Sequence, residues 1–230
     1  RWLLVQEATK TLHISYNASG ALQAAKRGDV VVIVDVIDMS TTAEAVLEAG
    51  ALLVLGASPD QTTAPVAVNP RKIAYQAGKI ALKHKVEIIL ITEPRFCKPE
   101  QRLKYVQLVR QGIKQAGASL ETVLPNIGAQ ITKFTDFERK VVIIVSSSGG
   151  VAFDAAYNNG AVKVITGTVA RTKLKKGIKP IRKAAHRAIK YARNYKTGIT
   201  LIAASANSYE DILAVEKIAQ VIIKLGFLGN

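Results

Sequence analysis

The fold is indicated by two stretches of similar layout, VVIVDVIDMSTTAEAVLEAGALLVLGA at residues 31–57 and VVIIVSSSGGVAFDAAYNNGAVKVITG at residues 141–167. Each begins with an apolar, β-branched run, passes through polar residues into a helical pattern that closes at Gly50 or Gly160, and ends in a second apolar run. The two glycines are 110 residues apart, as are the first residues of the two stretches. This layout predicts two strand–loop–helix–strand units and therefore an internal duplication.

The length and composition favour one large folded domain. The chain has 230 residues, of which 49% are hydrophobic, so it can bury a substantial core. We predict an α/β fold with three layers (α/β/α), in which a mostly parallel sheet is built from two related halves, about 1–125 and 126–230. We expect a single domain over residues 1–230 with one continuous sheet. Its buried parallel strands are predicted from four apolar runs, at residues 30–34, 86–91, 141–145 and 199–203.

The composition also bears on the cellular compartment. No apolar run approaches the roughly 18 residues of a membrane-spanning helix, which argues against a membrane protein. The N-terminus has no basic stretch followed by an apolar segment, the pattern that is typical of a signal peptide. Cys97 is the single cysteine, which excludes an internal disulfide and favours a reducing compartment. We therefore expect a cytoplasmic protein.

The net charge of +15 is concentrated in one segment. Residues 171–196 contain eleven Lys and Arg and no Asp or Glu, which leaves a charge of only +4 for the rest of the chain. Apolar residues recur there at helical spacing after Pro180, and the cations of the opposite, solvent-facing side are Arg182, Lys183, Arg187, Lys190 and Arg193. This helix presents either an ordinary solvated face or a surface for an anionic partner, which would be a phosphorylated substrate or RNA.

Polar segments follow all four predicted strands. Ligands of open α/β sheets bind beyond the carboxyl ends of the strands, so we expect these segments to form one composite site. They lie at residues 35–42, 92–95, 146–150 and 204–211. Together they contain carboxylates, hydroxyls, glycines and one arginine, which are groups that hold a hard metal cation and a phosphate.

Structural explanations also exist for these segments. Thr41 and Glu44 have the spacing of a capping box, so the hydroxyls of this loop are either helix caps or part of a phosphate site. Asp35 and Asp38 suit either a magnesium site or a solvated loop. Residues 146–150 suit either an anion-binding nest or a flexible turn.

The remaining polar residues narrow the choice of chemistry. Glu93 and Arg95 flank Pro94, and this arginine either clamps an anionic group of a ligand or pairs with the glutamate. No Walker lysine follows residues 146–150, which argues against a P-loop NTPase. The three histidines are widely scattered, and Cys97 has no neighbouring base, so we predict neither a zinc site nor a reactive cysteine.

The order of these segments resembles the 2-phosphosulfolactate phosphatase family, the magnesium-dependent acid phosphatases of coenzyme M biosynthesis. The first loop is similar in its Asp35, its Ser40-Thr41-Thr42 and the closing Gly50 of the helix. Further similar segments follow in the family's order at residues 92–95, 126–129, 145–151 and 201–211. The similarity covers most of the chain.

Two arginines of the family pattern are absent from this chain. The arginine of the first loop is missing, and Asp38 lies in that vicinity. In the segment at residues 145–151, the Asn and Arg of the family pattern are replaced by Ser148 and Val151. The sequence is therefore identified as a divergent member, in which the fold is better preserved than the substrate.

The resemblance and the residue types together imply a magnesium-dependent phosphohydrolase of a small phosphorylated organic acid. Asp35 and Glu93 are the candidate catalytic residues, with Glu93 orienting or deprotonating water. The candidate ligands of Mg²⁺ are Asp35, Asp38, Glu210 and Asp211. The candidate substrate-binding residues are Ser40, Thr41, Thr42, Arg95, Asn126, Ser146, Ser147, Ser148, Gly149 and Gly150.

Two other functions remain open. One is a different enzyme on the same scaffold, whose substrate is less anionic and whose Asp38 recognises a polar or cationic group. The other is a non-catalytic protein that binds RNA or another anion through residues 171–196. The expected partner is a small anionic substrate and not a membrane. Nucleic acid is not favoured as a partner, and association with a second copy of the chain is left open.

Overall fold

Strands and helices alternate from Leu12 to Lys224 in the computed structural model, which describes residues 10–229. The first part of the chain contains β1 (Leu12–Tyr16), α1 (Asn17–Lys26), β2 (Val30–Val34), α2 (Ser40–Glu48), β3 (Leu53–Ala57), α3 (Pro70–His84), β4 (Ile88–Thr92), α4 (Pro99–Lys104) and α5 (Gln107–Ala116). The second part contains β5 (Leu120–Pro125), the 3₁₀ helix η1 (Gly128–Lys133), β6 (Val141–Val145), α6 (Gly149–Asn158), β7 (Lys163–Thr166), α7 (Lys179–Tyr195), β8 (Ile199–Ala203) and α8 (Tyr209–Lys224). Among the described residues, no helix combines the length and the apolar character needed to cross a membrane.

The central strands form where the sequence is continuously apolar and rich in β-branched residues. Every residue of β2, β4, β6 and β8 is buried, as expected for parallel strands with helices on both faces of the sheet. The four strands predicted from the apolar runs are therefore confirmed, and β4 starts two residues later than expected.

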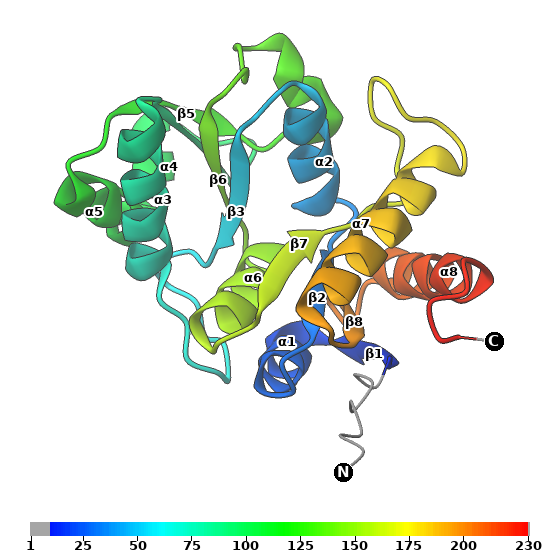
Figure 1. Ribbon diagram of the computed structural model, residues 1–230. Helices are drawn as coiled ribbons and strands as arrows, with labels where there is room; N and C mark the ends of the chain where they lie inside the picture. The colour runs from blue at the N-terminus through cyan, green and yellow to red at the C-terminus, as the bar shows by residue number, and fades with distance from the viewer. Residues whose placement is uncertain (1–9, 230) are drawn as a thin grey trace.

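These strands form two parallel sheets rather than one. The strand orders are β1-β8-β2-β7 and β3-β6-β4-β5, and all neighbouring pairs are parallel. The expectation of one continuous sheet is wrong, because β3 pairs with β6 and β7 pairs with β2. Hydrophobic patterning marks a strand as buried but does not specify its neighbours. The predicted three-layer α/β/α class and its two related halves are confirmed (Figure 1).

The two halves of the fold exchange strands. In chain order, β1 to β4 correspond to β5 to β8, and each sheet contains two strands from each set. One sheet combines β1 and β2 with β7 and β8, and the other combines β5 and β6 with β3 and β4. In this correspondence β5 begins the second half, whereas the predicted boundary near residue 125 placed it in the first. Each half therefore completes its sheet with strands of the other.

A shared hydrophobic core joins the two sheets. Val30, Val32 and Val34 of β2 pack with α7 and α8, whereas Val31 and Ile33 pack in a cluster that includes α1, α6 and strands of the second sheet. Within that cluster α1 and α6 lie side by side (Figure 1). This helix pair therefore packs against β2 of one sheet, and α6 also packs against β3 of the other.

A buried acid at an equivalent place in α2 and in α6 holds each exchanged strand. Glu44 of α2 accepts a hydrogen bond from Thr166 Oγ1 at the end of β7 (2.8 Å) and pairs with Arg187 of α7. Asp154 of α6 accepts hydrogen bonds from Ser58, which follows β3, through its Oγ (2.6 Å) and its backbone N (3.2 Å). Each carboxylate therefore fixes the end of a strand from the other half.

Two predictions about helices α2 and α7 need correction. Met39 is the N-cap of α2 and makes no side-chain cap, so Thr41 and Glu44 do not form a capping box. Helix α7 carries Pro180 in its first turn as predicted, but Arg187 is not on the solvent-facing side, because it pairs with Glu44. The other cations of the predicted face are exposed, namely Arg182, Lys183, Lys190 and Arg193.

Candidate active site

The tips of β2 and β6 meet at Asp35, which follows β2 and is 3% exposed. Its Oδ2 accepts hydrogen bonds from Ser148 Oγ and from the backbone N of Gly149, both at 2.6 Å. Its Oδ1 accepts a hydrogen bond from the backbone N of Asp38 at 2.9 Å. The two loops therefore come together as expected from the duplication, although their strands belong to different sheets.

The first hydroxyls of α2 shape the loop that carries Asp35. Ser40 Oγ accepts a hydrogen bond from the backbone N of Asp35 (2.7 Å) and donates one to a β2 carbonyl (3.1 Å). Thr41 Oγ1 donates to the carbonyl of Val36 (2.5 Å) and forms a hydrogen bond with Thr168 Oγ1 (2.9 Å). Both predicted substrate-binding hydroxyls are thus bonded within the protein, and they hold the loop in place.

Asn126 connects this loop to the tips of β4 and β5. Its Oδ1 accepts a hydrogen bond from Thr42 Oγ1 (2.6 Å), and its Nδ2 donates to the carbonyl of Asp38. The same Nδ2 lies 3.5 Å from Glu93 Oε1. Asn126 and Thr42 are fully buried, so they act on the site by positioning Asp38 and Glu93.

Arg95 also binds the loop after β2. Its Nη2 donates to the carbonyl of Ile37 (3.1 Å) and lies 3.7 Å from Asp38 Oδ1. An ion pair therefore forms at this strand tip, but its acidic partner is Asp38 and not Glu93. The guanidinium is partly neutralised by this partner, which reduces its attraction for an anionic ligand.

Burial and neighbouring negative charges raise the pKa of three carboxyl groups of the site. Burial, followed by the negative charges of Asp38 and Asp35, raises the pKa of Glu93 to about 8. Burial raises the pKa of Asp211 to about 6, and it raises the pKa of Asp35 although the hydrogen bond from Ser148 opposes it. A carboxyl group with a pKa near 8 is suited to donate a proton at neutral pH. The role expected of Glu93 from the sequence, to orient or deprotonate water, stays a prediction.

The start of α8 closes the site on another side. Asp211 Oδ1 accepts a hydrogen bond from the backbone N of Val36 (2.8 Å), and Ser208 caps the helix by accepting from the backbone N of Asp211 (3.3 Å). Glu210, the neighbouring predicted metal ligand, is exposed. Asp211 therefore supports the loop that carries Asp35 and Asp38.

The carboxylates of the site do not form a ready-made cluster for a magnesium ion among the described residues. Across residues 10–229, no three Asp, Glu, His or Cys side chains come together in a way that could hold a metal. Both oxygens of Asp35 already accept hydrogen bonds, and Asp211 Oδ1 accepts one from a backbone amide. Mg²⁺ binding by Asp35, Asp38, Glu210 and Asp211 therefore stays a prediction, and we derive no chemical step from it.

A pocket of about 260 Å³ lies beside Ser148. It is open to solvent and is bordered by the starts of α1 and α6, the residues that follow β8 and part of the segment that follows β3. Its polar lining consists of Asn17, Thr62, Thr63, Ser147, Ser148 and Ser205, and none of its lining side chains is charged. Hydroxyl groups donate hydrogen bonds to phosphate oxygens, so the pocket suits a small anionic group.

Residues 146–150 contribute to this site in different ways. Ser147 and Ser148 line the pocket. Ser146 is buried, and its Oγ accepts a hydrogen bond from the backbone N of Gly150 at 2.8 Å. Gly149 is buried against Asp35. Of the predicted anion-binding segment, two serines therefore face the pocket and the other residues build the turn.

The wall formed by residues 58–69 was not predicted. Asp154 holds both ends of this segment through Ser58 and through the backbone N of Asn69 (2.7 Å), and Thr62 and Thr63 between them line the pocket. The four long apolar runs predict four strand tips for the site. The tip of β3, which leads into this wall, is not among them, because β3 is only partly buried. The available signal was the polar, proline-containing composition of 58–69 between a strand and a helix.

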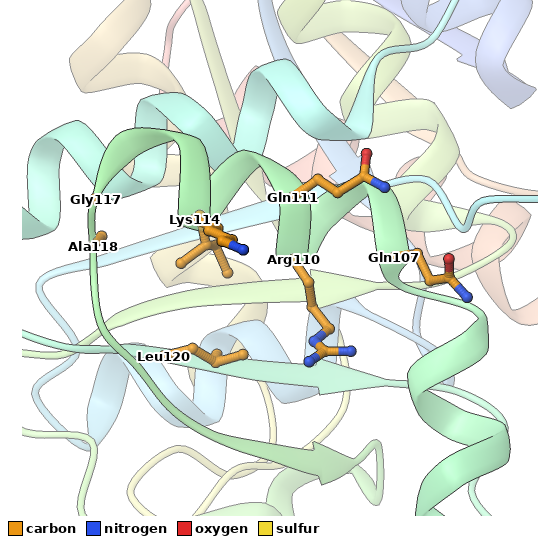
Figure 2. A pocket seen from close by; sticks show the side chains of 8 residues that line it. Gln107, Arg110, Gln111, Lys114, Gly117, Ala118 and Leu120 are labelled. Atoms are coloured by element: carbon orange, nitrogen blue, oxygen red, sulfur yellow. The ribbon is translucent and has the colours of Figure 1, made fainter.

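In the described part of the chain, three hollows are larger than this pocket, and the two largest of these three lie away from the site. Figure 2 shows the first, of about 590 Å³, which is lined by Arg110 and Lys114 of α5 and by Leu120 at the start of β5. It lies near the amino end of β5, whereas Asn126 follows the carboxyl end. The second, of about 420 Å³, lies between the edge strands β3 and β7. Neither is lined by a residue that bonds to Asp35, whereas Ser148 lines the smaller pocket.

Comparison with known proteins gives no assignment of this site. No protein-family model matches the chain, and no curated protein matches it significantly. One similar solved structure is a β-decarboxylating dehydrogenase from Thermococcus kodakarensis, with 16% sequence identity and a TM-score of 0.25. The match covers 68% of this chain and 55% of the dehydrogenase chain, so it spans about half of that protein. A similarity at this level carries no argument about function.

Proposed function

We propose that the chain hydrolyses the phosphate monoester of a small organic acid and is a divergent relative of the 2-phosphosulfolactate phosphatases. The observation that carries the proposal is the contact between buried Asp35 and Ser148 at the edge of an uncharged, hydroxyl-rich pocket. A carboxylate that accepts a proton, next to donors that bind phosphate oxygens, is the minimum that this hydrolysis requires.

The pocket and the carboxyl cluster contribute different parts of the proposed reaction. The hydroxyls of Ser147, Ser148, Thr62, Thr63 and Ser205 would bind phosphate oxygens. Asp38 contacts Asp35 Oδ1, the oxygen that Ser148 does not use, and Asn126 contacts both Asp38 and Glu93, so the organic part of the substrate would extend toward these two acids. The high pKa of Glu93 supports a role as proton donor to a leaving oxygen.

The pairing of Arg95 with Asp38 favours a substrate with fewer anionic groups than phosphosulfolactate has. That compound carries a phosphate, a sulfonate and a carboxylate, and the described pocket has no charged side chain. A second anionic group of a substrate would have to compete with Asp38 for Arg95. We therefore propose that the small organic acid carries a single acidic group besides its phosphate, so that the substrate is a phosphorylated monoacid.

Release of inorganic phosphate tests this proposal directly. The chain is incubated with a panel of phosphorylated monoacids, diacids and neutral alcohol phosphates, with Mg²⁺ and with EDTA, since a magnesium requirement follows from the family resemblance. Asp35→Asn should lower turnover at least about 100-fold with the fold intact. Glu216→Gln, an exposed carboxyl change on α8, is the matched control and should leave turnover unchanged. Absence of phosphate release across the panel under both conditions would contradict the proposal.

A further inference from the structure

Ser148 differs from every other hydroxyl of the pocket in its partner. Its Oγ is 2.6 Å from Asp35 Oδ2, it lines the pocket, and it is partly exposed, whereas Asp35 is 3% exposed. We propose that Ser148 is a nucleophile that accepts the phosphoryl group and forms a covalent phosphoserine. This inference rests on the proposed phosphohydrolase function for the reaction class, and on the Asp35–Ser148 contact for the residue.

The surroundings of Asp35 hold its carboxylate in position to act as the base. Backbone N–H groups of Asp38 and Gly149 donate to its two oxygens, at 2.9 and 2.6 Å, so the side chain cannot rotate freely. The residue after Ser148 must be very small, because a Cβ on Gly149 would lie 2.5 Å from Asp35 Oδ2. A nucleophile within hydrogen-bonding distance of a base that a third group orients is the arrangement that activates serine hydroxyls.

The neighbouring serines lack this arrangement. Ser146 is buried, and its Oγ accepts from the backbone N of Gly150. Ser147 lines the pocket and is exposed, and within residues 10–229 its hydroxyl makes no hydrogen bond to a carboxylate. The geometry therefore selects one of three consecutive serines, and this provides internal controls.

The proposed reaction has two steps, in which Asp35 is the base for Ser148 and Glu93 is the acid for the leaving oxygen. In the first, Ser148 Oγ attacks phosphorus while the bond from phosphorus to the alcohol oxygen breaks, the hydroxyl proton passes to Asp35, and the proton of Glu93 passes to the leaving oxygen. In the second, water attacks phosphorus while the Ser148 Oγ–phosphorus bond breaks, a proton of water passes to Glu93, and the proton on Asp35 returns to Ser148 Oγ. The sum is an ester and water converted to an alcohol and inorganic phosphate, with no other reactant.

Trapping of the intermediate tests the proposal. The protein is mixed with p-nitrophenyl phosphate, quenched in acid and analysed by peptide mass spectrometry, and phosphate is expected on Ser148. Ser148→Ala should abolish the label, and Asp35→Asn should slow its formation at least about 100-fold. Ser147→Ala should still be labelled at Ser148, and Ser119→Ala, an exposed change far from the pocket, should be labelled at the rate of the parent.

A fluorophosphonate probe separates this proposal from the proposed function. It phosphonylates an activated serine with loss of fluoride, so its reaction with Ser148 needs no phosphatase substrate. If the probe labels Ser148 but no ester releases phosphate, the result supports Ser148 as a nucleophile and contradicts the proposed phosphohydrolase function. Phosphate release that persists in Ser148→Ala would overturn the nucleophile and leave the phosphohydrolase standing. Absence of label from both reagents on the folded parent also overturns the nucleophile.

Discussion

The loops after β2 and β6 occupy equivalent places in the two halves but carry different chemistry. The first, residues 35–39, contains two carboxylates, and the second, residues 146–148, contains three serines and is two residues shorter. Ser148 and Gly149 donate hydrogen bonds to Asp35, so the second loop provides the donors for the acceptor in the first. Duplication thus supplied a scaffold with two tips, and the site exists because the tips differ.

The helices that follow these loops show the opposite relation. Glu44 of α2 and Asp154 of α6 are both buried, and each binds the end of the strand that has crossed to the other sheet. Here the two halves use the same device for the same purpose. The scaffold is therefore symmetric where it fixes the exchanged strands and asymmetric where it forms the site. The following predictions test that division.

The largest effect is expected at the two buried acids. Asp154→Ala leaves donors of Ser58 and Asn69 without a partner and removes one of the two acceptors of Asn158. Glu44→Ala leaves the mostly buried guanidinium of Arg187 without its ion-pair partner. Each should lower the free energy of unfolding by about 3 to 5 kcal/mol. Urea unfolding measures this value for both variants.

Glu216→Ala is the control for these two variants, because it removes an exposed acid of α8 and should change stability by less than about 0.5 kcal/mol. If one of the two variants loses less than about 1 kcal/mol of the free energy of unfolding and the other loses more, the two exchanged strands are not held in the same way.

A smaller effect is expected at the two glycines that begin α6. A Cβ on Gly150 would lie 2.2 Å from the carbonyl oxygen of Ala57, and a Cβ on Gly149 would lie 2.5 Å from Asp35 Oδ2. Either change to Ala should destabilise the protein by about 1 to 3 kcal/mol through overpacking, although Gly to Ala ordinarily stabilises a helix by about 1 kcal/mol. Only Gly149→Ala displaces Asp35, so it should also lower turnover of the folded protein.

Activity measured well below the unfolding temperature distinguishes the two glycine variants. Equal turnover in Gly149→Ala and Gly150→Ala would mean that contact with Asp35 does not set the reaction rate. Ser119→Ala, an exposed change elsewhere, should leave both stability and turnover unchanged.

The sequence predicted the elements of this fold better than their arrangement. The four buried strands follow from continuous β-branched runs, and the meeting of Asp35 with Ser148 follows from the duplicated layout. The strand exchange does not follow, because a buried strand has the same pattern beside any neighbour. The burial of Arg187 also could not be predicted from the sequence. Its partner Glu44 is 143 residues away, and helical spacing alone places Arg187 with the exposed cations.

The carboxyl groups around the first loop, Glu93 and Asp211, should make the stability of the protein depend on pH. The serine loop has no group that titrates near neutral pH. The folded pKa of Glu93, about 8, is above its ordinary value of 4.5, so the folded state binds more protons between these values. The associated stability is fully present below about pH 4.5 and is lost as pH rises through 8, and Asp211 acts in the same direction up to about pH 6. Glu93→Gln should therefore lose less stability between pH 5 and pH 9 than the parent loses.

Urea unfolding at several pH values measures this difference. Glu216→Gln is the control and should follow the profile of the parent. A Glu93→Gln profile as steep as that of the parent would mean that the proton uptake belongs to other groups.

The smallest effect on stability is expected at the exposed cations of α7, whose counterpart in the first half is α3. Replacement of Arg182, Lys183 and Lys190 by Gln keeps good helix formers on an exposed face, so stability should change by less than about 0.5 kcal/mol per site. The matched control removes the same charge from exposed positions of α3, namely Arg71, Lys79 and Lys83. Because both variants lose the same net charge, any difference in their activity or binding is due to the position of the cations on α7.

If the α7 cations only attract a small anionic substrate, their loss should lower kcat/KM modestly, and the difference should disappear as salt screens the field. If they bind RNA, affinity should fall and the slope of log affinity against log salt should flatten by roughly 0.7 per lost contact, whereas the α3 control retains binding. We expect the first result, because the three cations face solvent and the site lies at the strand tips. Tight RNA binding that is lost in the α7 variant alone would identify α7 as a nucleic-acid surface and favour the binding function over the phosphohydrolase.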